Sequence, residues 1–239
     1  VQAVNDPPVN SAPQTLTLDE DGAYALVAAE GTAISISDVD SNEGTGEVRV
    51  SLTALHGVLT TTEQEGLQFE TGDGIADRQM VLQGQLVDVN AALDGMVFQA
   101  DLDYAGPATI DVITTDVGAV GDVASDRDLV QLLVRAVNDA PRVEAPGLQH
   151  TDEDMPLALT AGNENAIWIV DVDAAEGVLA LDLSVTGGVI DLGVVDGLVF
   201  QLGDGNHDAQ VVVSGTLQDL NGALAELVFT PDSDRTGEA

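Results

Sequence analysis

The chain has 239 residues, of which 42 are Asp or Glu and six are Arg; there is no Lys, and the formal net charge is −36. This excess of negative charge excludes a nucleic-acid binder, which needs a basic face, and argues against docking on anionic lipid. Disorder is excluded as well, because 44% of the residues are hydrophobic. The absence of cysteine removes disulfide frameworks, thiolate metal sites and cysteine nucleophiles.

The chain opens with VQAVNDPPVN, which has the Pro-bearing character of a linker between domains and lacks the features of a signal peptide. We therefore expect residues 1–8 to be a linker from an upstream repeat. No apolar run reaches the roughly 18 residues of a membrane span, so no membrane insertion is expected.

The two halves of the chain resemble each other in motif order and spacing. AVNDPP at 3–8 returns 133 residues later as AVNDAP at 136–141. Farther along, GLQFETGDG at 66–74 returns 131 residues later as GLVFQLGDG at 197–205. Self-similarity at a fixed period is the signature of repeated domains.

The repeat predicts three parts: a linker at 1–8, repeat 1 at 9–139 and repeat 2 at 140–239. The change of offset predicts a two-residue deletion between residues 173 and 187. Repeat 2 also lacks the counterpart of residues 109–136, which has the pattern of two strands.

Alternating apolar and polar residues, separated by Gly, Asp and Asn, predict β-strands. The predicted strands cover residues 46–55, 108–116, 128–137, 166–173 and 210–217. One helical turn interrupts the strands in each repeat, at 88–95 and 219–226, with an Asp or Asn, such as Asp88 or Asp219, as the expected cap. The fold class is therefore all-β: tandem Greek-key β-sandwich domains, each with one short helical turn. Four phenylalanines in equivalent pairs are expected in the cores, at positions 69, 98, 200 and 229.

The acidic residues gather in short motifs, DED, DVD, GDG and the linker ND, which recur in both repeats. Alternating acids put two carboxylates on one side of an extended segment. Ca²⁺ prefers such oxygen ligands, and Asn adds an oxygen without further repulsion. The motifs therefore predict calcium binding. A solvated acidic surface adapted to high salt is the alternative, and the GDG turns at Asp73 and Asp204 are interpreted as ordinary hairpin turns.

Repeat 1 resembles a cadherin-type domain in its motifs. DVDS at 38–41 resembles the cadherin D-x-D motif, and LDY at 102–104 resembles L-D-R-E. IDVITTDVG at 110–118, followed by a strand and AVNDAP, resembles V-x-A-x-D-x-G and the closing linker. The block from GDG to DVNAALDGMVF resembles the cadherin-like or Ig-like repeats of large bacterial surface proteins and RTX-type adhesins.

The resemblance implies Ca²⁺ sites at domain junctions. The implied ligands of the junction between the repeats are Glu20, Asp103, Asp116, Asn138, Asp139, Asp171 and Asp173. The implied ligands of a half-site at the N-terminal end are Asn5, Asp6, Asp38 and Asp40. Glu153 and Asp154 would serve a downstream junction, and Asp101, Asp232 and Asp234 are weaker candidates.

We expect an extracellular, calcium-stiffened spacer or adhesion repeat of a large bacterial surface protein, with neighbouring repeats of the same chain as partners. One alternative is a self-assembling fibre or surface-layer subunit, in which strand exchange completes repeat 2. Another is a carbohydrate- or protein-binding β-sandwich module. An enzyme is not expected, because no His recurs between the repeats and no nucleophile or nucleotide motif is present.

Overall fold

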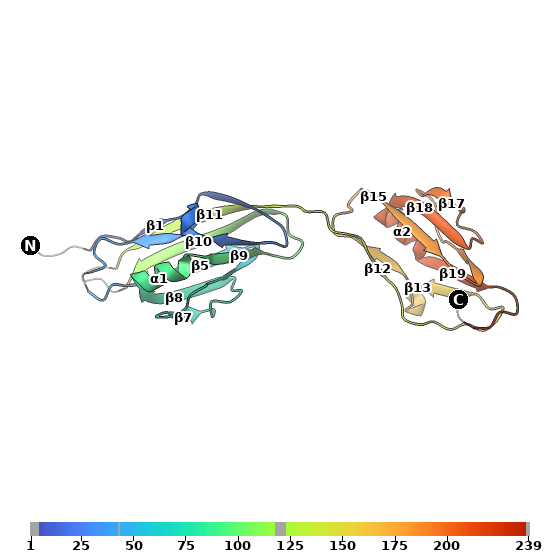
Figure 1. The fold of residues 1–239 in the computed structure, drawn as a ribbon, viewed down its shortest axis with the longest axis horizontal. Coiled ribbons are helices and arrows are strands. Elements are labelled where there is room, and N and C mark those ends of the chain that lie inside the picture. Colours follow the sequence, from blue (N-terminus) through green and yellow to red (C-terminus); the bar gives the residue numbers. More distant parts are fainter. Residues whose placement is uncertain (1–4, 43, 118–122, 238–239) are drawn as a thin grey trace, which may run out of the picture. The chain divides into compact units, whose positions relative to one another are not determined.

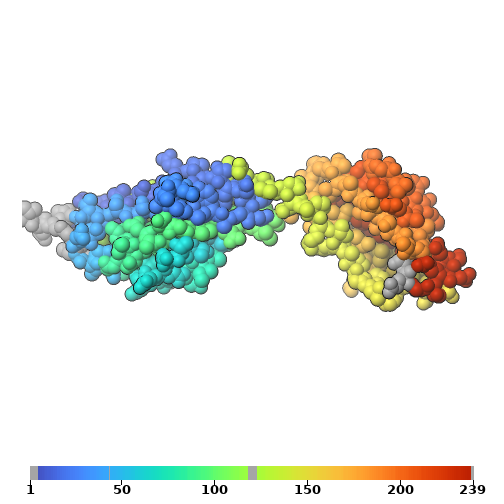
Figure 2. All heavy atoms as spheres, viewed as in Figure 1, coloured from blue at the N-terminus to red at the C-terminus, as the bar shows by residue number. Residues whose placement is uncertain are grey.

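The computed structural model describes residues 5–42, 44–117 and 123–237 (Figure 1). Gly118 of the predicted V-x-A-x-D-x-G segment lies outside these residues. The chain forms two compact units, unit 1 (Val1–Val137) and unit 2 (Asn138–Ala239), with the boundary two residues before the predicted one. In Figure 2 the atoms of unit 1 run from blue to yellow-green and those of unit 2 from yellow to red.

Unit 1 is built of strands of three to eleven residues with one α-helix among its described residues. Its elements are β1 (Val9–Ser11), β2 (Thr15–Asp19), β3 (Ala23–Leu26), the 3-10 helix η1 (Ala28–Glu30), β4 (Ser35–Ser37), β5 (Glu47–Leu55), β6 (Gly57–Thr60), β7 (Gln68–Thr71), β8 (Gln79–Gln85), α1 (Leu86–Leu93), β9 (Met96–Ala100), β10 (Gly106–Asp116) and β11 (Ser125–Arg135). One sheet has the order β2-β11-β10-β5-β8-β7 and the other β3-β9-β6, while β1 pairs with β4. All pairs are antiparallel except β2 with β11.

The core of unit 1 lies between its two large sheets. On β5 the alternate residues Val48, Val50 and Leu52 are at most 1% exposed, as the sequence pattern predicts. From the opposite sheet, Phe98 of β9 is fully buried in the same cluster. Phe69 packs against this core from its edge. The unit is therefore a β-sandwich, and the predicted all-β class is confirmed.

The helix of each unit has eight residues and begins two residues before the predicted segment. In α1 the N-cap is Gln85, without a side-chain cap bond, and Asp88 lies in the first turn. The predicted cap at Asp88 is therefore wrong, because the chain passes directly from β8 into the helix. An acid in the first turn is still favourable beside the positive end of the helix dipole.

Unit 2 repeats this order of elements from β1 to β9, except that among its described residues β2 has no counterpart. Its elements are β12 (Arg142–Glu144), β13 (Leu157–Thr160), the 3-10 helix η2 (Ala161–Asn163), β14 (Trp168–Val170), β15 (Val178–Ser184), β16 (Gly188–Asp191), β17 (Val199–Leu202), β18 (Gln210–Thr216), α2 (Leu217–Leu224) and β19 (Glu226–Pro231). The sheets are β12-β14, β13-β19-β16 and β15-β18-β17. In α2 the cap is Thr216, whose hydroxyl accepts the Asp219 N–H, so Asp219 is not the cap either.

The registers of the two units match. Val50 pairs with Leu82 between β5 and β8, and Leu181 pairs with Val213 between β15 and β18. Both partners in unit 2 stand 131 residues after those in unit 1. Among the described residues, unit 2 has no counterpart of β10 and β11, so β15 has one neighbour where β5 has two.

The predicted strands match the structure in sheets of three or more strands, and one prediction is too long in a two-stranded sheet. Residues 46–55, 108–116, 128–137 and 210–217 all lie in strands whose ends differ from the predicted ones by a few residues. The predicted strand at 166–173 shrinks to the three residues of β14, because its only neighbour is the equally short β12.

Candidate cation-binding clusters

The first acidic cluster of unit 1 follows the end of β4. The Asp6 N–H donates to the Asp40 carboxylate at 2.6 Å, and the Asp40 N–H donates to Asp38 Oδ1 at 2.8 Å. The Ser41 hydroxyl closes the turn by donating to the Asp38 carbonyl at 2.9 Å. Asp38 and Asp40 are half-buried, and Val39 between them is 78% exposed. The turn thus holds the Asp40 carboxylate against the backbone of the incoming linker.

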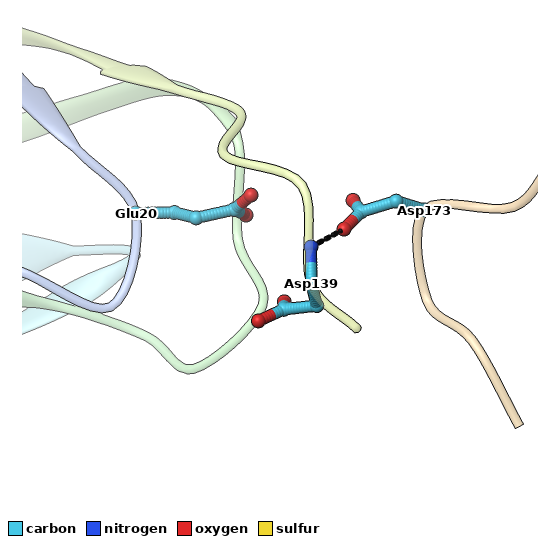
Figure 3. A group of neighbouring side chains, drawn as sticks. All are labelled: Glu20, Asp139 and Asp173. Atoms are coloured by element: carbon cyan, nitrogen blue, oxygen red, sulfur yellow. Dashed lines mark hydrogen bonds between the residues drawn. The ribbon is translucent and has the colours of Figure 1, made fainter. Parts of the chain in front are cut away.

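Unit 2 builds the same cluster with its own linker. The Asp139 N–H donates to the Asp173 carboxylate at 2.6 Å (Figure 3), and the Asp173 N–H donates to Asp171 Oδ1 at 3.0 Å. A carboxylate oxygen of Asp139 lies within 4.8 Å of one of Asp173. The structure therefore brings together the predicted residues Asp139, Asp171 and Asp173, as it does Asp6, Asp38 and Asp40.

The opposite end of unit 1 carries a buried glutamate. Glu20 follows β2 and is only 6% exposed, and its N–H donates to the Arg135 carbonyl at 2.9 Å. Its carboxylate accepts the Val137 N–H at 2.7 Å, which ties the chain end of the unit to β2. Glu20 therefore has a structural partner and also presents a carboxylate near the last residue of the unit.

A second acidic pair lies next to Glu20. The Asp103 N–H donates to Asp21 Oδ1 at 3.0 Å, and their carboxylate oxygens come within 4.8 Å of each other. Both have a left-handed backbone, with φ of 58° at Asp21 and 55° at Asp103, which Asp tolerates better than most residues. In unit 2 the Asp234 N–H donates to Asp154 Oδ1 at 3.0 Å, again with both residues left-handed.

Asp21 is a residue that the sequence reasoning missed. The DED motif drew attention to Glu20 through the resemblance, although its third acid recurs as Asp154. The recurrence of all three letters was the available signal. Asp234, considered a weaker candidate, proves equivalent to Asp103.

The placement of Asp116 at the junction with Glu20 and Asp103 is wrong. β10 begins beside Val134 and ends beside Ser125, so its two ends lie at opposite ends of the unit. Asp116 is the last residue of this eleven-residue strand, roughly 33 Å from its first residue. It is 4% exposed, and its N–H donates to the Ala124 carbonyl at 3.0 Å.

Three other candidates have different surroundings. Asp101 forms a two-pronged ion pair with Arg78, at 2.7 and 3.2 Å, so its charge is already compensated. Asn138 is exposed, and its side-chain amide donates to the Asp139 carbonyl at 2.7 Å. Asn5 is half-exposed beside Asp6 at the start of the described chain.

The GDG segments are turns, as predicted, and each is held by a further aspartate. Asp77 accepts the N–H groups of Asp73 and Gly74, at 3.0 and 2.8 Å. Asp208 accepts those of Asp204 and Gly205 at 2.9 and 2.7 Å. The recurring spacing G-D-G-x-x-D carried this signal in the sequence.

An asparagine of each α-helix holds the strand that leads into the acidic turn, β4 in unit 1 and β14 in unit 2. Asn90 of α1 accepts the Ile36 N–H at 2.8 Å and donates to the Ile36 carbonyl at 2.9 Å. Asn221 of α2 makes the same two bonds with Ile169, both at 2.8 Å. From the sequence, an Asn of this repeated segment is expected only as a helix cap, not as a partner of a strand.

No family model matches the chain, and no curated protein does. Among solved structures, it is similar to "Protocadherin Gamma B2 extracellular cadherin domains 3-6", with 14% identity, a TM-score of 0.29 and coverage of 88% of this chain and 39% of that one. The "Crystal structure of the Protocadherin GammaB4 extracellular domain" is similar with 17% identity and a TM-score of 0.31, over 98% of this chain and 31% of that one. The structure titled "BspA_C_WT" is similar with 9% identity and a TM-score of 0.27, over 91% of this chain and 84% of that one. The chain thus spans less than half of either protocadherin chain. Similarity at this level transfers no function, and the class of the protein, an all-β sandwich, follows from its own sheets.

Proposed function

We propose that the chain is an extracellular spacer or adhesion repeat whose acidic clusters bind Ca²⁺ where successive units join. The observation that carries the proposal is the recurrence of the clusters in both units. The hydrogen-bonded Asp triplet at the start of each unit recurs with its partners and distances, and so does the left-handed Asp pair.

The donor set of the clusters fits calcium. Their side-chain ligands are carboxylate oxygens, with Asn amides beside them, and they contain neither His nor Cys. Ca²⁺ takes six to eight such oxygens, whereas Mg²⁺ prefers fewer protein ligands and keeps its water. A carboxylate that accepts one backbone N–H keeps further lone pairs for a cation. Asp38, Asp40, Asp171 and Asp173 are in this situation, and none of them forms an ion pair within the described chain.

The number of carboxylates explains why the cation would act at joints. The triplet at the start of a unit supplies three carboxylates, too few for a full calcium shell without other oxygens. We infer that carboxylates of a neighbouring unit complete the set, and Glu20 and Asp103 are the residues of repeat 1 that the family resemblance implies for this role. A divalent ion would replace mutual repulsion by attraction and stiffen the joint, in a chain whose net charge is −36.

The test is a thermal melt in EDTA, in Mg²⁺ and in Ca²⁺ at fixed ionic strength. Trp168 is the only tryptophan and lies in unit 2, so its fluorescence follows that unit. At a Ca²⁺ concentration about 100 times Kd, the ligand adds about 2.7 kcal/mol to the free energy of unfolding, which corresponds to a rise of roughly 10 °C in Tm.

The decisive variant is Asp171→Asn with Asp173→Asn, because Asn still accepts the backbone N–H but carries no charge. The matched control is Glu63→Gln with Glu65→Gln, which removes two charges from an exposed loop of unit 1. We expect the first variant to lose most of the calcium-specific rise and the control to keep it. Equal rises in Mg²⁺ and Ca²⁺, or equal responses of the two variants, would show that the acids form only a solvated surface.

A further inference from the structure

Two buried polar side chains meet between β1 and β10 of unit 1. Thr114 of β10 is fully buried, and Asn10 of β1 is 7% exposed. The Thr114 hydroxyl donates to Asn10 Oδ1 at 2.6 Å, across 104 positions of the sequence. Because a carbonyl bond is about 1.23 Å long, the Thr114 oxygen lies less than about 3.9 Å from the Asn10 amide carbon. A hydroxyl oxygen and an acyl carbon are therefore already close to the roughly 3–3.5 Å of a reacting arrangement.

The nitrogen of the Asn10 amide is not used by the fold. Asn10 Nδ2 is buried and has no hydrogen-bond partner among the described residues. Asn165 of unit 2 is equally buried, but its Nδ2 donates to Gln149 Oε1 at 3.0 Å and to the Ala158 carbonyl at 3.2 Å. An unsatisfied buried donor destabilises the folded state, so a reaction that expels the Asn10 nitrogen as ammonia removes this cost.

A carboxylate lies beside the same two residues. Asp126 of β11 stands opposite Thr114 in the register of β10 and β11, and both belong to the inward-facing positions of their strands. Asp126 Oδ2 accepts the Asn10 backbone N–H at 2.8 Å. The carboxylate is therefore placed to accept the hydroxyl proton of Thr114 as its oxygen attacks, which is the role of a general base.

We propose that Thr114 and Asn10 form an internal ester bond that links β10 to β1. The Thr114 oxygen bonds to the side-chain carbonyl carbon of Asn10, and the hydroxyl proton passes to Asp126. The bond between that carbon and Nδ2 then breaks, and the nitrogen leaves as ammonia with the proton that Asp126 held. The products are one ester and one ammonia, so the step needs no oxidant, reductant or co-reactant.

The ester fastens a short strand to the large sheet of unit 1. β1 has three residues and pairs with β4, which also has three, whereas β10 lies inside the six-stranded sheet. A pull on the chain before β1 would reach β10 through the ester and bypass residues 11–113. Unit 2 has Val143 at the position of Asn10, as the pairing of both residues with an isoleucine shows, so it cannot form this bond.

The experiment is intact-mass spectrometry of the denatured chain after incubation at neutral pH in EDTA. Trypsin cleaves this lysine-free chain only after Arg, so Asn10 falls in the peptide 1–49 and Thr114 in the peptide 79–127. We expect a mass below that of the sequence by one ammonia, about 17 Da, and the two peptides joined as one. Mild alkali, which hydrolyses esters and leaves amides intact, should separate them.

Thr114→Val removes the hydroxyl and should restore the full mass, whereas Thr114→Ser keeps a hydroxyl and should still lose ammonia. Asp126→Asn should slow the loss about tenfold or more, and Asp128→Asn on the same face of β11 is its matched control. The peptide 143–235, which contains Asn165, should stay linear. A parent chain with the full sequence mass and separate peptides would overturn the proposal, and so would an ammonia loss that persists in Thr114→Val.

Discussion

Replacing the helix asparagine by alanine tests how the fold holds the acidic turns. Asn90→Ala and Asn221→Ala remove equivalent pairs of hydrogen bonds in units 1 and 2. Asn90→Ala removes the side-chain partner of the Ile36 N–H and C=O groups. Asn221→Ala does the same for Ile169. These strand residues are 4% and 6% exposed, so water replaces the lost partners poorly.

The expected cost follows from the two backbone groups. An unsatisfied buried donor or acceptor costs about 1–3 kcal/mol. Because each asparagine is itself half-exposed, some water can reach the vacated place, and we take a total of about 2–3 kcal/mol in the free energy of unfolding. With a urea m-value of about 2 kcal/mol/M, the midpoint of the affected unit should fall by roughly 1 M.

The single tryptophan separates the two units in one assay. In a urea titration followed by Trp168 fluorescence, Asn221→Ala should lower the midpoint by this amount, whereas Asn90→Ala should not. Calorimetry should show the complementary loss in unit 1 for Asn90→Ala. Asn163→Ala is the matched control, since Asn163 is exposed and makes one bond, to the Ala158 carbonyl. If the urea midpoint fell no further for Asn221→Ala than for the control, the idea that the helix asparagine holds the strand would be refuted.

Three further outcomes are expected. Gly57→Ala should cost about 1–3 kcal/mol by thermal melt, because a Cβ there would collide with the Phe98 ring and the Gln99 carbonyl. Leu52→Ala should cost about 2–5 kcal/mol in unit 1, and the loss for Leu183→Ala in unit 2 should be clearly smaller, because Leu183 is only half-buried and lines an open groove of that unit. The hydrogen bond from Arg49 lowers the pKa of Glu70, so this pair stabilises the protein above the ordinary pKa of a glutamate and loses its effect as pH falls through the lowered value. Any difference in Tm between the parent and Glu70→Gln should therefore shrink as the solution is acidified.

The sequence alone predicts which side of a strand is buried. Alternation on β5 predicts which residues are buried, because the period of two is a property of the strand itself. The repeat adds what alternation cannot supply, since recurring letters at one offset mark positions with the same surroundings. Asp6, Asp40, Asp139 and Asp173 were found in this way, and the structure joins them in two equivalent pairs.

Features that depend on strand direction were beyond the sequence. Asp116 follows LDY by only a dozen residues, and a resemblance based on motifs gives no sign that a long strand carries it to the other end of the unit. The bonds of Asn90 to Ile36 span 54 positions and depend on how α1 lies over β4. Such contacts are fixed by tertiary packing, which local patterns do not record.

The two-residue deletion in the second repeat shows which contacts of the acidic turn are independent of the length of the loop that follows it. Asp173 keeps the offset of 133 from Asp40, while Leu179 on β15 already has an offset of 131 from Val48, so the deletion lies between Asp173 and Leu179. This loop directly follows the acidic turn, yet the bond from the linker N–H to the second Asp is 2.6 Å in both units. The turn is anchored instead by the preceding strand, which the helix asparagine holds. Loop length can therefore vary between repeats while the carboxylates stay in place, as the proposed calcium sites would require.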